Sequence, residues 1–136
     1  MKVFFDTSSL FKPYHRETGT EELMMMFNSN GIETIYLAEI TMIEFSSVVW
    51  KKCRKNEIDE NAAKKLIEKF ELDTIKFTFV QENQLLRQNA RELIEKHWRK
   101  GLRTLDSIQL SSALNVKNEI DLCLTSDNLL SEGMSN

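Results

Sequence analysis

Hydrophobic positions along the chain change repeatedly between short apolar runs and longer patterns with helical spacing. Residues 3–5 and 122–124 are continuously apolar, and residues 35–40 are apolar and β-prone, so these three stretches predict strands. Continuous apolarity is typical of strands buried on both faces, which predicts central positions for the first and last of them. Residues 75–79 instead alternate apolar and polar side chains. That alternation predicts a strand with one solvated face, near an edge of the sheet.

Apolar residues at steps of three and four predict helices between these strands. In residues 41–55 the apolar stripe consists of Met42, Phe45, Val49 and Cys53. Similar stripes predict helices over residues 22–27, 60–71 and 82–100, and Gly101 is placed to end the last of these. The stretch from 105 to 116 carries apolar residues pointing in several directions. We expect it to be a helix covered on most sides.

Strands that alternate with helices predict an α/β protein with a mostly parallel sheet, because parallel strands need crossover helices. The 136 residues predict one domain spanning 1–136, and 41% hydrophobic with 29% charged residues excludes a disordered or collagen-like chain. Cys53 and Cys123 lack metal-ligand spacing, so we expect reduced thiols. No apolar run approaches a membrane span, and no leader pattern precedes residues 3–5. We therefore expect no membrane association and a cytoplasmic location.

Two of the apolar strands end in the same way, with small hydroxyl residues and an aspartate. The first is followed by Asp6 in "FFDTSSL", and the last is followed by Asp127 in "LCLTSDNLL". Ligand crevices of parallel sheets lie at the carboxyl ends of the strands, where these two acids would converge if the strands are neighbours. Each aspartate could equally be an N-cap of the helix that follows it. Both interpretations stand at this point.

Two further acids lie in the predicted helices. Asp106 is the only charged residue between 105 and 116, and a buried aspartate is costly unless it is paired or bound to a metal. Glu44 in "TMIEFSSVVWKK" lies off the apolar stripe of its helix. The alternatives are that Asp106 stabilises the start of its helix and that Glu44 is a solvated surface residue.

Four carboxylates in one place would require a positive partner, because like charges a few Å apart repel by roughly 3 kcal/mol per pair. Oxygen ligands without histidine or cysteine select Mg²⁺ or Mn²⁺. The net charge of −3 argues against a strongly basic nucleic-acid clamp. Setting the four acids aside leaves 21 − 4 = 17 acidic residues against 18 lysines and arginines, which predicts a balanced surface around an acidic hole.

The segments "FFDTSSL", "TMIEFSSVVWK", "RTLDSIQLSSAL" and "LTSDNLL" together resemble the PIN-domain family, and most closely its VapC-like toxin ribonucleases. The resemblance covers nearly the whole chain. It implies a PIN-like α/β/α sandwich, a metal-dependent nuclease acting on RNA, a cognate antitoxin and a homodimer. It also implies an acidic constellation of Asp6, Glu44, Asp106 and Asp127, with Ser8 and Thr125 as supporting hydroxyl residues. Met24–Met26 fits contacts with a second copy or an antitoxin.

The chain departs from the family pattern at two places. Gln109 stands where relatives commonly have a histidine, three residues after the third acid, which we interpret as minor in an all-oxygen site. Many relatives also continue past the last helix into one more strand, whereas this sequence stops nine residues after Asp127, which leaves both the presence and the absence of a final strand open at this point.

These expectations give a mechanism of phosphodiester hydrolysis by a metal-activated water, in which none of the acids is itself the nucleophile. Asp6, Glu44 and Asp106 would hold the main ion directly or through water, and Asp127 would complete a second position or orient the water. Two basic clusters are candidates to bind RNA around the site: Lys51 and Lys55, and Arg99, Lys100 and Arg103. Each cluster has the alternative of a solvated helix end.

Two other functions stay open on the sequence alone. One is a non-catalytic PIN-like module that binds RNA or protein, although four unpaired acids would only destabilise such a module. The other is a phosphatase or phospho-acceptor with an aspartate after the first strand. Asp6 lacks the second aspartate two residues later that haloacid-type phosphatases use, and no lysine follows a later strand as a receiver needs.

Overall fold

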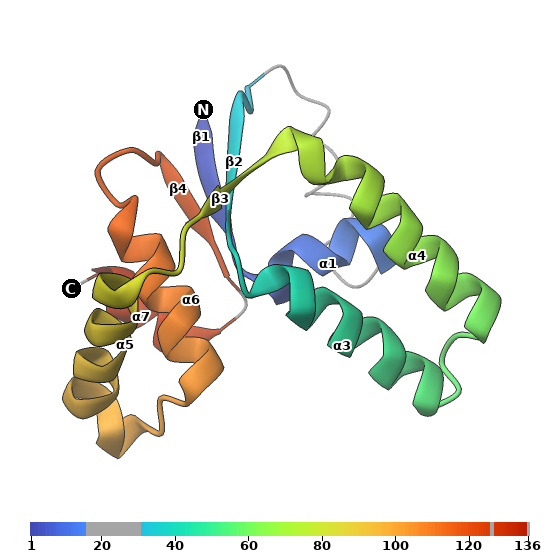
Figure 1. Ribbon diagram of the computed structural model, residues 1–136. Helices are drawn as coiled ribbons and strands as arrows, with labels where there is room; N and C mark the ends of the chain where they lie inside the picture. Colours follow the sequence, from blue (N-terminus) through green and yellow to red (C-terminus); the bar gives the residue numbers. More distant parts are fainter. Residues whose placement is uncertain (16–30, 126, 136) are drawn as a thin grey trace.

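The computed structural model describes residues 1–15, 31–125 and 127–135 (Figure 1). The strands are β1 (Lys2–Phe5), β2 (Thr34–Ala38), β3 (Phe77–Val80) and β4 (Leu122–Leu124). The α-helices are α1 (Thr7–His15), α3 (Thr41–Arg54), α4 (Glu60–Asp73), α5 (Gln84–His97), α6 (Thr104–Asn115) and α7 (Asn128–Ser135), with short 3₁₀ turns at Thr74–Lys76 and Trp98–Lys100. In these described ranges no helix has the length and apolarity needed to cross a bilayer. The helix predicted over 22–27, with Met24–Met26, lies outside the described residues.

The sheet confirms the predicted α/β class, because its four described strands are all parallel and run in the order β3-β2-β1-β4. Val3 of β1 pairs with Ile35 of β2 on one side and with Leu122 of β4 on the other. The chain winds outward from β1 to one edge at β3 and then returns to place β4 on the opposite side. This reversal next to β1 creates the crevice into which the strand ends point.

Helices cover both faces of the sheet, as Figure 1 shows, with α1, α3 and α4 on one side and α5, α6 and α7 on the other. Alternating side chains of β1 supply both cores: Val3 and Phe5 join the cluster under α1, α3 and α4, whereas Phe4 joins the cluster under α5 and α6. All three are fully buried. β1 is therefore the most buried of the described strands, and this fixes the position of Asp6, the residue that follows it.

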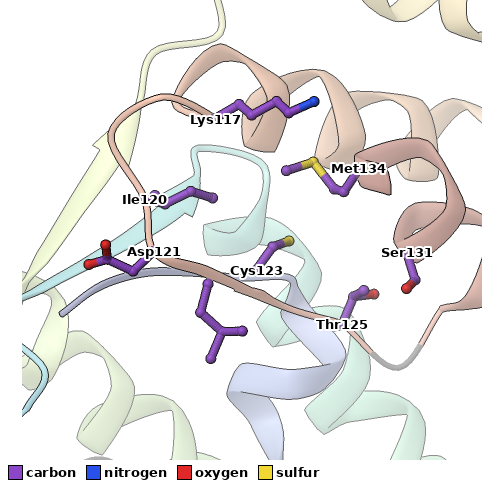
Figure 2. Close-up of a pocket in the computed structure, with 8 residues that line it drawn as sticks. Lys117, Ile120, Asp121, Cys123, Thr125, Ser131 and Met134 are labelled. Carbon is purple, nitrogen blue, oxygen red and sulfur yellow. The ribbon is translucent and has the colours of Figure 1, made fainter. Parts of the chain in front are cut away.

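The last strand differs from its predicted central position. Among the described strands β4 has a neighbour only on the β1 side, and its burial is partial, with Leu122 37% exposed. Its outer side borders a hollow of about 290 Å³, in which Figure 2 shows Cys123 and Met134. An apolar run of three residues cannot distinguish a central strand from a partly buried edge strand.

Two further expectations about apolar residues were wrong. Met42 is 41% exposed although it was assigned to the apolar stripe of α3, because the buried face of that helix runs through Thr41, Phe45 and Val49 instead. Ile75 lies in the 3₁₀ turn before β3 and is 89% exposed, so the strand begins two residues later than predicted, at Phe77. The position of β3 at an edge of the sheet is confirmed. Gly101 has φ 79° and ends the 3₁₀ turn that follows α5, as predicted.

A hydrogen-bonded polar network connects the C-terminal ends of α1 and α4. Asp73 at the end of α4 accepts hydrogen bonds from Tyr14 Oη (2.8 Å), Lys69 Nζ (3.1 Å) and Lys76 Nζ (3.2 Å). Burial raises the pKa of this carboxyl, but the three hydrogen bonds outweigh burial and hold its pKa below the usual range. The same burial and the adjacent carboxylate raise the pKa of Tyr14. The network joins α1, α4 and the turn before β3.

Candidate active site

Asp6 is fixed at the point where the central strand β1 passes into α1. Its backbone N–H donates to the carbonyl of Leu124 (3.1 Å), which extends the pairing of β1 with β4 by one residue. Oδ1 accepts hydrogen bonds from Ser8 Oγ (3.1 Å) and from the backbone N–H of Ser9 (2.9 Å), and Oδ2 accepts one from Thr125 Oγ1. Asp6 is 5% exposed. Both interpretations of Asp6 therefore apply, since it caps α1 and also lies at the strand end.

Asp127 occupies the matching position after β4. Its Oδ1 accepts the backbone N–H groups of Leu129 (2.7 Å) and Leu130 (3.3 Å), so it is the N-cap of α7. Thr125 links the two strand ends, because its Oγ1 donates to Asp6 and accepts the backbone N–H of Asp127 (3.0 Å). The hydroxyl residues Ser8 and Thr125 thus both contact Asp6. This small network sets the positions of the two aspartates relative to each other.

Glu44 lies in the first turn of α3 and is half-buried rather than solvated. Its Oε1 accepts hydrogen bonds from Thr7 Oγ1 (2.9 Å) and from Gln109 Nε2 (2.7 Å). The same amide nitrogen lies 3.0 Å from Thr7 Oγ1 and 3.0 Å from Thr41 Oγ1, and the two hydroxyls are 3.1 Å apart. Glu44 is therefore held by residues of α1 and α6 as well as by its own helix.

Asp106 lies in the first turn of α6 and is also half-buried. Burial raises the pKa of its carboxyl, and the negative charges of Asp127 and, less strongly, Asp6 raise it further. The backbone and the positive charge of Arg103 oppose these effects without cancelling them. Asp106 is thus close enough to the two strand-end aspartates to be affected by their charges.

One cleft of about 370 Å³ brings the four predicted acids together. Asp6, Glu44, Asp106 and Asp127 all line it, although they come from four different elements. Its remaining lining combines four polar residues, Thr7, Ser8, Ser47 and Gln109, with apolar side chains from α3, α6, α7 and the residue before α3: Ile40, Ile43, Val48, Leu105 and Leu130. The cleft is open at the carboxyl end of the sheet. An acidic floor with apolar walls strengthens electrostatic interactions with whatever enters it.

The donor set of this cleft fits a hard divalent cation, since all four side chains offer carboxylate oxygens. Over the ranges that the structure describes, however, no three of the Asp, Glu, His and Cys side chains are placed so that they could share one ion directly. Mg²⁺ is compatible with this spacing, because it is often held by one or two carboxylates and retains several waters. Asp6, Glu44, Asp106 and Asp127 are the residues that could hold it in that way.

The predicted basic residues differ in how free they are to meet an anion. Lys51 and Lys55 are exposed, and Lys51 lies two turns after Glu44 on the face of α3 that lines the cleft. Lys100 pairs with Glu132 (2.9 Å), and the guanidinium of Arg99 stacks on the ring of Trp98 at 4.8 Å. Arg103 immediately precedes α6, and its positive charge opposes the rise in the pKa of Asp106.

Sequence reasoning gave no role to Thr7 and Thr41 and treated Gln109 as a minor departure, although all three are buried in the network around Glu44. A signal for two of them was present. Thr41 precedes Glu44 by three residues and Gln109 follows Asp106 by three, so each lies one helical turn from an acid on nearly the same face. Thr7 directly follows Asp6, but no spacing rule marks it.

Comparisons with known proteins agree with this architecture. A family model of the PIN domain matches residues 3–132. A search of curated proteins finds no match. Three solved structures resemble the chain in fold, at 13–16% sequence identity.

The first of these is Mycobacterium tuberculosis VapC20, a sarcin-ricin loop cleaving toxin, which has 15% identity and a TM-score of 0.69 over 96% of this chain and 93% of that chain. FitAcB from Neisseria gonorrhoeae has 16% identity and a TM-score of 0.67 over 98% and 93%. VapBC2 from Rickettsia felis, bound to a DNA fragment from its promoter, has 13% identity and a TM-score of 0.60 over 93% and 100%. Because the family model matches nearly the whole length of the chain, and the fold agrees with these three structures, the chain belongs to the PIN domain family.

Proposed function

We propose that this chain is a Mg²⁺- or Mn²⁺-dependent endoribonuclease that hydrolyses RNA phosphodiester bonds, and that it is the toxin of a toxin-antitoxin pair. The observation that carries the proposal is the convergence of Asp6, Glu44, Asp106 and Asp127 on one cleft at the carboxyl end of the sheet. Capping alone does not account for it, because capping does not require four carboxylates in the same cleft. Membership of the PIN family and the RNA-cleaving toxin among the neighbours in fold support the choice of reaction.

A divalent cation bound by these carboxylates would supply neutralising charge and a water of lowered pKa. The residues of the chain perform the remaining tasks. Asp6 is held rigid by Ser8, Ser9 and Thr125, so its position does not depend on the ligand. Thr7 and Gln109 both donate to Oε1 of Glu44, so Oε2 is the oxygen through which Glu44 would bind a ligand. Preorganised carboxylates of this kind contribute mainly by electrostatic positioning.

Substrate binding requires positive charge at the rim of an acidic cleft. We propose two groups for that role: Lys51 and Lys55 at the end of α3, the helix that carries Glu44, and Arg99, Lys100 and Arg103 just before α6, the helix that carries Asp106. Phosphate contacts of this kind make affinity dependent on salt concentration. The whole chain from 1 to 136 would act as one domain in the cytoplasm, with a cognate antitoxin and a second copy of the chain as protein partners.

The test is cleavage of labelled structured RNA by the purified protein with Mg²⁺ or Mn²⁺, beside Asp6→Asn and Asp106→Asn variants. Both variants should lose about 100-fold or more of the rate. Glu68→Gln is the matched control, because Glu68 is exposed on α4, away from the cleft. This variant should cleave RNA at the wild-type rate. Equal cleavage by all four proteins would identify a contaminating nuclease and end the assignment.

A non-catalytic PIN module that binds RNA or protein is the second candidate. It is favoured by one observation, the lack of any three acids placed to share an ion directly within the described residues. The same experiment separates the two functions. A module of this kind would retain RNA, as measured by filter binding, without cleaving it at any metal concentration.

A further inference from the structure

Gln109 is placed to control the orientation of Glu44. It lies on α6, is 4% exposed, and brings its side-chain nitrogen to 2.7 Å from Glu44 Oε1. We propose that Gln109 is a positioning residue for the metal site, which holds the Glu44 carboxylate so that Oε2 faces the cleft. This inference rests on the proposed function, since it assigns a role within the same site.

The orientation of the Gln109 amide follows from its partner. A carboxylate only accepts hydrogen bonds, so the amide must turn its nitrogen, and not its oxygen, toward Glu44. That orientation leaves Gln109 Oε1 buried without a hydrogen-bond partner, and in the described part of the chain no other buried side-chain polar atom lacks one. A side chain selected only to fill space would not require an unpaired buried oxygen. The contact with Glu44 explains why the amide is present and why it points this way.

The two threonine hydroxyls complete the arrangement. Thr7 Oγ1 donates to Glu44 Oε1 at 2.9 Å, and its own oxygen receives the second N–H of Gln109 or the hydroxyl of Thr41. Both donors to Glu44 therefore converge on the same oxygen from different helices, α1 and α6. The carboxylate cannot rotate about its terminal bond without losing two hydrogen bonds at once. Removing either donor would free that rotation and weaken ligand binding through Oε2.

The test measures Mn²⁺ binding by electron paramagnetic resonance of the free ion, a readout that does not depend on cleavage. Gln109→Met keeps the length of the side chain but removes the donor, and we expect about 10-fold weaker binding. Gln109→His restores a donor and should bind within about 3-fold of the wild type. Ser112→Ala is the matched control, because Ser112 is equally buried on α6 but bonds only to Ile108 O of its own helix, and its dissociation constant should not change.

A purely structural role predicts a different pattern. If Gln109 only stabilised the fold, urea unfolding in EDTA would change in Gln109→Met while the dissociation constant for Mn²⁺ stayed at the wild-type value, and that result would overturn the inference. Equal weakening by methionine and histidine would overturn it as well. If Gln109→Met does not fold, Thr7→Val removes the other donor to the same oxygen, and an unchanged dissociation constant there is equally decisive. Failure of the wild type to bind Mn²⁺ would instead refute the proposed function.

Discussion

Replacing Asp106 with asparagine should make the metal-free protein more stable. The carboxyl of Asp106 has a raised pKa, first because it is partly buried and then because Asp127 and Asp6 repel its charge, so its ionised form destabilises the folded state at neutral pH. Two carboxylates about 7 Å apart repel by roughly 2.4 kcal/mol at an effective dielectric of 20. Partial exposure and the opposing charge of Arg103 reduce the net effect to about 1 kcal/mol. Asparagine is nearly isosteric and can still accept a backbone hydrogen bond.

The assay is thermal and urea unfolding of the wild type and the Asp106→Asn variant in EDTA. A gain of about 1 kcal/mol corresponds to a rise of roughly 3 to 5 °C in Tm for a chain of this length. The direction of the pH dependence follows because the pKa of Asp106 is higher in the folded than in the unfolded protein. The contribution of Asp106 to stability is fully present below the unfolded pKa, near 3.9, and is lost as the pH rises through the folded value, so the advantage of the variant should appear only above about pH 4.

Magnesium should reverse the order. A cation bound at tenfold excess over its Kd stabilises the folded wild type by about 1.4 kcal/mol, whereas the variant has lost a ligand and gains less. Glu68→Gln serves as the control and should stay within about 0.5 kcal/mol of the wild type in both conditions. A loss of stability in Asp106→Asn at neutral pH in EDTA would show that the carboxylates do not repel one another appreciably, and would refute the electrostatic account of the cleft.

Three other predictions concern separate parts of the molecule. Asp73→Asn should cost about 1–3 kcal/mol in urea unfolding at neutral pH by weakening its bond to Tyr14 and its two lysine contacts; because the folded pKa of Asp73 is lowered, this difference should shrink as the pH falls through it. Lys51→Gln should raise the KM for RNA with little change in kcat, and should reduce the slope of log affinity against log salt by about 0.7; an unchanged slope would remove Lys51 from the RNA surface. Gly133→Val should lower the free energy of unfolding by about 1–3 kcal/mol, and with it the Tm, because a Cβ there would lie 2.6 Å from Leu110 Cδ2. An unaltered Tm would mean that α7 shifts freely.

The elements of this fold were predictable because their periodicities are strong. Phe45 and Val49 are fully buried on α3, as the spacing of three and four predicted. The position of β4 in the sheet was not predictable in the same way. Residues 122–124 are apolar enough for a central strand, but among the described strands they pair only with β1, at the other end of the chain, and no local pattern encodes such a long-range pairing.

The acids of the site were easier to predict than their neighbours. An aspartate after an apolar strand is conspicuous, whereas Gln109 was interpreted as a minor departure from a family pattern. Its importance depends on Thr7, which is 102 residues away along the chain, and on Thr41, 68 residues away. Hydrogen bonds across such separations follow from the packing of α6 against β2, and that packing exists only in the folded chain.

Capping and chemistry are not competing explanations for these acids, because the fold uses the same positions for both. Asp6 and Asp127 cap α1 and α7, while Glu44 and Asp106 lie in the first turns of α3 and α6. Four helix N-termini therefore meet at one cleft, and each favours a nearby carboxylate by about 0.3–1 kcal/mol. Repulsion among neighbouring carboxylates amounts to roughly 2–3 kcal/mol per close pair, so the dipoles offset only part of it. The pKa of Asp106 is raised first by burial and then by the charges of Asp127 and Asp6, and a divalent cation would neutralise that remaining negative charge.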